Sequence, residues 1–253
     1  YDSLGTGTMV NYGYAAPELT VSGMPGTSPD EAGEFSRQNI AFYTDIEYNI
    51  NDLLVQIATR FEDFSDFGST SNLKVSARYS FNNYATLRGN FSTGFRAPTP
   101  GQSHYTSVFT SFDGVTGMQI NEGILKPTDS LSLVLGGAAL IPEESQNISF
   151  GVTSSYIENL NLYLDYYSID ITNKIIKSRN LPVQGNSDFS SLAFYTNALN
   201  TKTSGIDLVA TYTLKWGTLL GIAVNSNKTD VKSQNQVDDL DPVSSSTIFN
   251  LEN

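Results

Sequence analysis

A strict two-residue alternation near the middle of the chain constrains its fold more than any other feature. Residues 85–104 read ATLRGNFSTGFRAPTPGQSH. From Ala85 to Thr93 every second residue belongs to a mostly apolar set, and the residues between them are polar. Successive side chains of a strand point to opposite faces, so this period predicts a β-strand with one face hidden from water. The alternation stops at Arg96, before Pro98 and Pro100. Proline lacks a backbone donor, so we expect the strand to end there.

Seven other segments alternate in the same way and are each expected to form a strand: residues 38–50, 53–63, 73–81, 146–157, 161–171, 204–214 and 217–227. Their apolar sets include Leu53, Val55, Ile57, Leu73, Val75, Ile206, Leu208, Leu220 and Ile222. Charged side chains fall on the opposite parity, namely Arg60, Glu62, Lys74, Arg78, Arg88 and Asp207. In residues 161–171 the parity changes between Tyr166 and Tyr167, which predicts a β-bulge.

The connections between these strands alternate in length. The short ones fall at residues 49–52, 82–83, 158–160 and 215–217, and the long ones at 64–72, 95–145, 172–203 and 229–246. In an antiparallel meander every second connection lies at the same end, so all short turns are expected at one end. Short turns at one end, long loops at the other and strands of about ten residues are the plan of an outer-membrane β-barrel.

Aromatic side chains near the short turns fit the same plan. Tyr48, Phe81, Tyr156 and Tyr212 share the parity of the apolar faces, as expected for an aromatic girdle at a lipid–water boundary. Alternation alone also allows a soluble β-sandwich, in which the charged face would meet water.

Composition excludes several classes of function. The formal net charge of −12 argues against nucleic-acid binding, which needs a basic surface. With no cysteine and one histidine, His104, neither a thiolate site nor a dedicated transition-metal site is expected. The same lone histidine leaves no catalytic triad, so we expect no enzyme, no catalytic residue and no cofactor. The nearly apolar run at 131–141 is shorter than the ~20 residues of a spanning helix.

Five blocks resemble, in order, the C-terminal part of TonB-dependent outer-membrane receptors. They are RFEDFSDFGSTSNLKVSARYSF (60–81), LRGNFSTGFRAPTPGQ (87–102), LIPEESQNISFGV (140–152), LYLDYYSIDITNKI (162–175) and YTNALNTKTSGIDLVATY (195–212). The resemblance implies an all-β, antiparallel up-and-down transmembrane barrel of ~22 strands in the bacterial outer membrane, plugged by a separate N-terminal domain. It further implies TonB-dependent uptake of a scarce nutrient such as a ferric siderophore, cobalamin or a glycan.

The same resemblance implies the partners: outer-membrane lipid, the receptor's own plug domain, the TonB–ExbB–ExbD complex acting through that plug, and a small-molecule nutrient. Residues 1–253 are expected to be part of the barrel domain, about eight strands, without the plug and the C-terminal strands. The alternatives are a passive porin or autotransporter barrel, and a soluble β-sandwich adhesin or glycan-binding module.

Candidate site residues follow from this placement. Arg96 keeps the parity of Arg88, so it is expected to point into the barrel mouth, either toward ligand or plug, or paired with Glu143 or Glu144. The loop after it is expected to fold back over the mouth and to contact ligand through Arg96, His104, Tyr105, Phe109 and Phe112. Lumen-facing, plug-contacting residues are expected to be Arg60, Glu62, Lys74, Arg78, Arg88 and Asp207.

Overall fold

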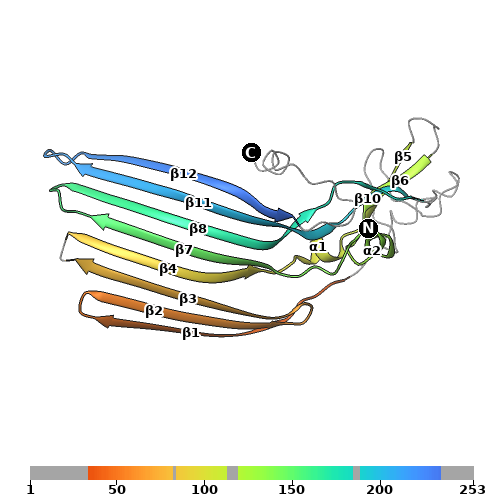
Figure 1. Ribbon diagram of the computed structural model, residues 1–253, viewed down its shortest axis with the longest axis horizontal. Coiled ribbons are helices and arrows are strands. Elements are labelled where there is room, and N and C mark those ends of the chain that lie inside the picture. The colour runs from red at the N-terminus through yellow and green to blue at the C-terminus, as the bar shows by residue number, and fades with distance from the viewer. Residues whose placement is uncertain (1–33, 82–83, 113–118, 185–188, 235–253) are drawn as a thin grey trace.

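The computed structural model describes residues 34–81, 84–112, 119–184 and 189–234, and it is dominated by one antiparallel sheet (Figure 1). The eight strands of this sheet are β1 (Asn39–Ile50), β2 (Leu53–Phe64), β3 (Gly68–Phe81), β4 (Ala85–Arg96), β7 (Glu143–Ser154), β8 (Leu160–Lys177), β11 (Tyr195–Thr213) and β12 (Leu219–Gln234). Their order across the sheet is the order of the chain. The predicted meander of eight strands is therefore confirmed.

The connections β1–β2, β7–β8 and β11–β12 lie together at one end of the sheet, the tight-turn end (Figure 1). Asn51 and Asn159 adopt positive φ there, and so does Gly217. This conformation suits asparagine and glycine best. Residues 82–83, predicted as the fourth short turn, lie outside the described residues. The opposite end carries the chain between β4 and β7 and between β8 and β11, and we call it the loop-bearing end.

One face of the sheet is apolar and exposed. Its rows can be followed through the strand register; one row contains Tyr48, Val55, Ala77, Gly89, Phe150, Tyr166 and Ile206. Among the predicted outward residues, Ile57, Leu73, Ile206, Leu208, Leu220 and Ile222 are exposed, and Leu53, Val55 and Val75 are partly exposed. We call this face the apolar band. So large an apolar surface requires a covering other than water.

Aromatic side chains collect at the tight-turn end of the apolar band. Tyr48, Phe81, Tyr156 and Tyr212 are all exposed. Two edge-on pairs join aromatic rings here: Tyr79 with Phe81 at 4.6 Å between centroids, and Tyr84 with Tyr156 at 6.1 Å. The placement predicted from the sequence is confirmed.

The bounds of three predicted long connections differ from those expected. Strand β3 begins at Gly68, so only residues 65–67 separate it from β2, and the expected loop at 64–72 is wrong. Likewise β8 and β11 leave only residues 178–194 between them, and β12 extends to Gln234. The sequence GSTSN (68–72) has the composition of a loop although it forms a strand. This part of β3 extends beyond the apolar band, so neither of its faces requires apolar residues.

The bulge predicted between Tyr166 and Tyr167 is also wrong. The two tyrosines pair consecutively with Ile206 and Gly205 on β11. Tyr167 lies on the polar face, where a Cβ at Gly205 would be 2.5 Å from its hydroxyl. The parity change therefore marks an aromatic residue on the polar face, seated over a glycine. Register shifts occur instead within β11, between Asn197 and Thr201.

A small lobe lies at the loop-bearing end. Its elements are α1 (Pro100–His104), β5 (Ser107–Phe112), β6 (Gln119–Ile124), α2 (Ser130–Val134), β9 (Leu181–Pro182) and β10 (Phe189–Ala193). The four strands form a second sheet in the order β5-β6-β10-β9, in which β6 and β10 are parallel. Leu125, Leu181, Leu192 and Phe194 form its buried core. The two long connections thus fold together as one unit.

None of the helices in the described residues has the length and hydropathy needed to cross a membrane.

Candidate functional site

An ion pair at the base of the lobe joins the two strands between which the chain departs. Arg96 ends β4 and lies directly opposite Glu143, which begins β7. The Nε and Nη2 atoms of Arg96 donate to the Glu143 carboxylate at 2.8 and 2.5 Å. The pairing predicted between these residues is confirmed, whereas Glu144 lies on the other face of β7. Arg96 lies beyond the last row of the apolar band, which contains Phe91 and Ile148. Its hydrogen bonds to Glu143 raise the pKa of Arg96, so the guanidinium stays charged.

Glu143 is the buried member of this pair. Its side chain is 8% exposed, compared with 57% for Arg96. The same carboxylate accepts a hydrogen bond of 2.7 Å from the backbone N–H of Ile175 on β8. One carboxylate therefore ties β4, β7 and β8 together at the point where the lobe begins.

Asparagines on β8 and β11 fix the segment that leads into β7. The side chain of Asn197 donates to the carbonyls of Ile141 and Asn173 and accepts from the Ile141 N–H, at 2.7 to 3.0 Å. Asn173 adopts φ of 57°, and its N–H donates to the Asn200 side chain at 2.9 Å. These contacts satisfy the backbone of Asn173, which the register shifts of β11 leave out of the ladder, and the backbone of Ile141, which precedes β7. Sequence reasoning missed them, although amides inside a strand (NALN, 197–200) were a signal.

Arg37 links three further segments at the same end, and it too was missed. Its guanidinium donates to both oxygens of Asp66 in the β2–β3 turn, at 2.7 to 3.1 Å. It also donates to the Pro98 carbonyl at 2.6 Å and lies 5.0 Å from the ring centroid of Phe67. The start of β1, the β2–β3 turn and the chain leaving β4 are therefore held at one cation.

The predicted contacts in the long loop are only partly brought together. His104 ends α1, which begins with a capping box formed by Thr99 and Gln102. The His104 ring stacks on Phe35, with 3.8 Å between centroids and 5° between planes. Tyr105 follows the helix and is exposed. Phe109 and Phe112 belong to β5 of the lobe, and their side chains lie outside the described residues.

The face opposite the apolar band is charged. One row across it contains Arg78, Arg88, Gly151, Asp165, Asp207 and Asn225. Arg88 donates to both oxygens of Asp165 at 2.6 to 3.0 Å. Near the loop-bearing end, Arg60 pairs with Glu62 at 2.7 Å. All six residues predicted for the lumen thus share the face opposite the apolar band.

Two cations on this charged face lack a partner within the described part of the chain. Lys74 and Arg78 make no ion pair or hydrogen bond there, whereas Arg88 is paired with Asp165. Together with Asn90 the three cations line a hollow of about 390 Å³ over β3 and β4. The Oδ1 atom of Asn90 is buried there without a hydrogen bond. This hollow is suited to an acidic group. Over the residues described, no cluster of three or more His, Asp and Glu is placed to hold a metal ion.

Comparison with known proteins gives one family and a consistent set of folds. The family model described as "TonB dependent receptor-like, beta-barrel" matches residues 1–249. No curated protein sequence matches the chain. Among solved structures, the siderophore receptor PirA from Pseudomonas aeruginosa is similar, with a TM-score of 0.62 and 17% identity over 78% of this chain and 35% of PirA.

Two further structures show the same fold. The ferric enterobactin receptor PfeA from Pseudomonas aeruginosa gives a TM-score of 0.55 and 15% identity over 78% of this chain and 27% of PfeA. The RagAB peptide transporter gives 0.56 and 16% identity over 78% of this chain and 23% of that chain. The chain thus spans about a third or less of these proteins.

Proposed function

Because this chain belongs to the TonB-dependent receptor β-barrel family, we propose that it forms part of the wall and mouth of a receptor that imports a scarce nutrient across the outer membrane. Barrels of this family lie in the bacterial outer membrane, so lipid is the covering that the apolar band requires. We place residues 1–253 in the barrel domain, with the plug supplied by another part of the receptor.

The observation that carries this proposal is the division between the two faces of the sheet. Ile148 and Phe150 are exposed on the apolar band, while Ser149 and Gly151 between them belong to the charged face. A passive water-filled barrel would share this division. The folded lobe favours a receptor over a passive barrel, because loops with a packed core present a defined surface to a ligand.

The charged face is the proposed lumen wall. Lys74 and Arg78 are proposed to meet acidic groups of the plug, since a barrel cation without a partner gains most from a carboxylate in a confined lumen. Arg60, Glu62, Arg88 and Asp207 are proposed to face the same space, although each already has a partner within the sheet.

The vestibule is proposed at the loop-bearing end. Arg96 stands at its base, and the candidate ligand contacts are His104 at the end of α1, Tyr105 after it, and Phe109 and Phe112 on β5. The nutrient is proposed to be a ferric siderophore, cobalamin or a glycan. The similar structures are described as receptors for siderophores and as a peptide transporter, so the shared fold by itself does not choose among cargoes.

Deletion of the gene for the full receptor tests this function. The deletion strain and its parent are grown with limiting iron, limiting cobalamin or a single glycan as the carbon source. The proposal predicts that the deletion strain grows poorly in one of these media. In that medium the parent strain is expected to grow normally only while its TonB complex is active. Uptake that continues unchanged when the TonB complex is inactivated would identify a passive barrel instead.

A further inference from the structure

The sheet opens between β3 and β4 at the loop-bearing end. The ladder between these strands ends at the pair Lys74 and Ser92. Beyond it, the Leu73 N–H donates to the Thr93 side chain at 3.0 Å instead of to the β4 backbone. Residues 68–72 remain paired with β2 and residues 93–96 with β7, so each strand keeps one partner and faces the other across a gap.

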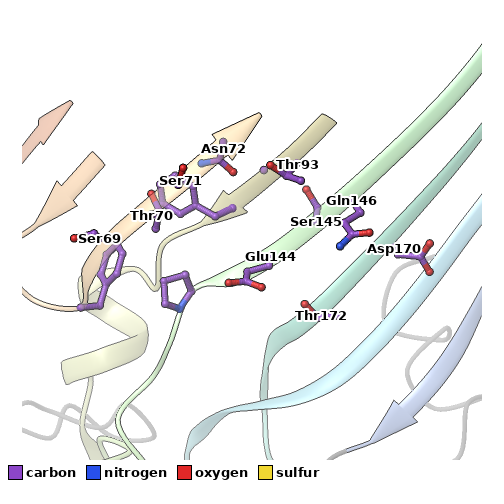
Figure 2. Close-up of a pocket in the computed structure, with 14 residues that line it drawn as sticks. Ser69, Thr70, Ser71, Asn72, Thr93, Glu144, Ser145, Gln146, Asp170 and Thr172 are labelled. Carbon is purple, nitrogen blue, oxygen red and sulfur yellow. The ribbon is translucent and has the colours of Figure 1, made fainter. Parts of the chain in front are cut away.

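This gap is part of a groove of about 460 Å³, which we call the β3–β4 groove. Figure 2 shows the side chains that β3, β4, β7 and β8 contribute to it. Phe67, Phe95 and Pro142 give it an apolar border. The aromatic side of this border is fixed, because Phe64 packs on both Phe67 and Phe95, with centroids 4.5 and 5.6 Å apart.

Polar side chains line the rest of the groove, and several of them have no partner in the described part of the chain. The side chains of Ser71, Asn72, Glu144, Gln146 and Thr172 make no hydrogen bond to the described part of the chain. Thr70 Oγ1 is buried and is also without a partner. Ser71, Glu144, Gln146 and Thr172 are exposed, so a ligand can replace the water that they bind, whereas the buried Thr70 hydroxyl is costly unless water or a ligand satisfies it. The lining of the groove therefore presents hydroxyl groups, amide groups and the unpaired carboxylate of Glu144 close together.

The charges of the lining select among ligands. Within the described ranges no lysine or arginine lines the groove, so phosphate and carboxylate ligands find no cation there. Asp170 is already paired with Lys202 at 3.2 Å, which leaves Glu144 as the lining carboxylate without a partner. A neutral molecule rich in hydroxyl groups fits best, because each hydroxyl both donates and accepts, and C–H surface can lie on the apolar border.

The height of the groove places it at the membrane surface. Glu144, Gln146 and Thr172 share the face of the apolar band. They lie one or two rows beyond Phe91 and Ile148, a rise of about 7–14 Å at the spacing of strand residues. The outward side of the groove therefore lies just above the hydrocarbon, at the level of lipid headgroups, while Thr70 and Asn72 line it from the charged face.

From these observations we propose that the β3–β4 groove is a saccharide-binding site on the outer wall, separate from the nutrient path through the lumen. Its ligand is a neutral sugar segment, either the headgroup sugars of an outer-leaflet glycolipid or a free oligosaccharide. This proposal does not depend on TonB-dependent import, since the contacts that it assigns to the saccharide, Glu144 and Thr172, share the outward face of the sheet.

The test uses the full-length receptor, purified in detergent and stripped of bound glycolipid. Calorimetry measures binding of a neutral, hexose-only oligosaccharide from the outer core of lipopolysaccharide, of maltotriose, and of lipid A without core sugars. Two variants remove groove contacts: Glu144→Ala, and the nearly isosteric Thr172→Val, which keeps a β-branched strand residue. The matched controls are Glu47→Ala and Thr44→Val, both on β1 and away from the groove.

The proposal predicts that at least one of the two saccharides binds, that each groove variant weakens that binding by about fivefold or more, as expected for one lost hydrogen bond, and that both controls leave it unchanged. Binding of the core oligosaccharide alone identifies a glycolipid headgroup, and binding of maltotriose identifies a free oligosaccharide. Binding of lipid A alone, binding of neither saccharide, or equal binding by the groove variants and their controls would overturn the proposal.

Discussion

Arg88 and Asp165 pair across an intervening strand, and Gly151 makes this possible. Arg88 is on β4 and Asp165 on β8, with Gly151 of β7 directly between them in the register. A Cβ at Gly151 would lie 1.9 Å from Asp165 Oδ1 and 2.7 Å from Arg88 Nε. The ion pair therefore occupies the space that a side chain on β7 would fill.

The change Gly151→Ala is expected to separate this pair. Both partners are partly exposed, so they can move, and we expect the free energy of unfolding to fall by no more than about 1 kcal/mol. Urea unfolding of the full receptor in lipid measures this. Gly221→Ala is the control, since a Cβ there meets only ordinary contacts at 3.9 Å or more. Equal stability of the two variants would show that the arginine–aspartate pair contributes nothing measurable.

Adjacent residues on β7 test which face meets lipid. Phe150→Lys places a charge on the apolar band, one row deeper than Ile148, and is expected to cost about 2–4 kcal/mol near mid-membrane. Ser149→Lys places the same charge on the lumen face and is expected to cost less than about 1 kcal/mol. Unfolding in lipid vesicles distinguishes the two variants. The reverse order of stabilities would show that the assignment of the lipid-facing and lumen-facing sides is wrong.

The role of Glu143 can be separated from that of its neighbour. Glu143→Ala leaves Arg96 and the Ile175 N–H without their shared partner, and we expect a loss of about 1–3 kcal/mol concentrated at the loop-bearing end. Hydrogen exchange should therefore quicken around residues 173–177 while the tight-turn end keeps its protection. Glu144→Ala, one residue away, is expected to change neither region; faster exchange throughout the sheet in Glu143→Ala would argue against a local tie.

The sequence predicts the spanning parts of the strands well because lipid imposes a strict period. Ile148 and Phe150 must point outward and Ser149 inward, and a shift of one residue would reverse all three. Beyond the lipid this constraint ends, so the polar start of β3 at residues 68–72 resembles a loop although it is a strand.

Long-range contacts left no pattern that could be read from the chain. Arg37 reaches Asp66 and Pro98, which are 29 and 61 residues away. Strands β6 and β10 pair in parallel although about 70 residues separate them, as the Ser190 bond to Asn121 shows at a separation of 69. The Arg96–Glu143 pair was accessible to sequence reasoning because both residues flank one long connection and share one parity.

Removal of residues 103–138 from the full-length receptor tests the proposed vestibule most directly. The deletion takes away β5, β6, α2 and the end of α1 but keeps Arg96, Glu143 and the asparagines at the base. Binding of the nutrient identified by the growth experiment is measured on whole cells, with the amount of barrel in the outer membrane determined in parallel. The account predicts a loss of affinity of about tenfold or more, equivalent to one or two well-placed contacts. Unchanged affinity with a normal amount of barrel would contradict it.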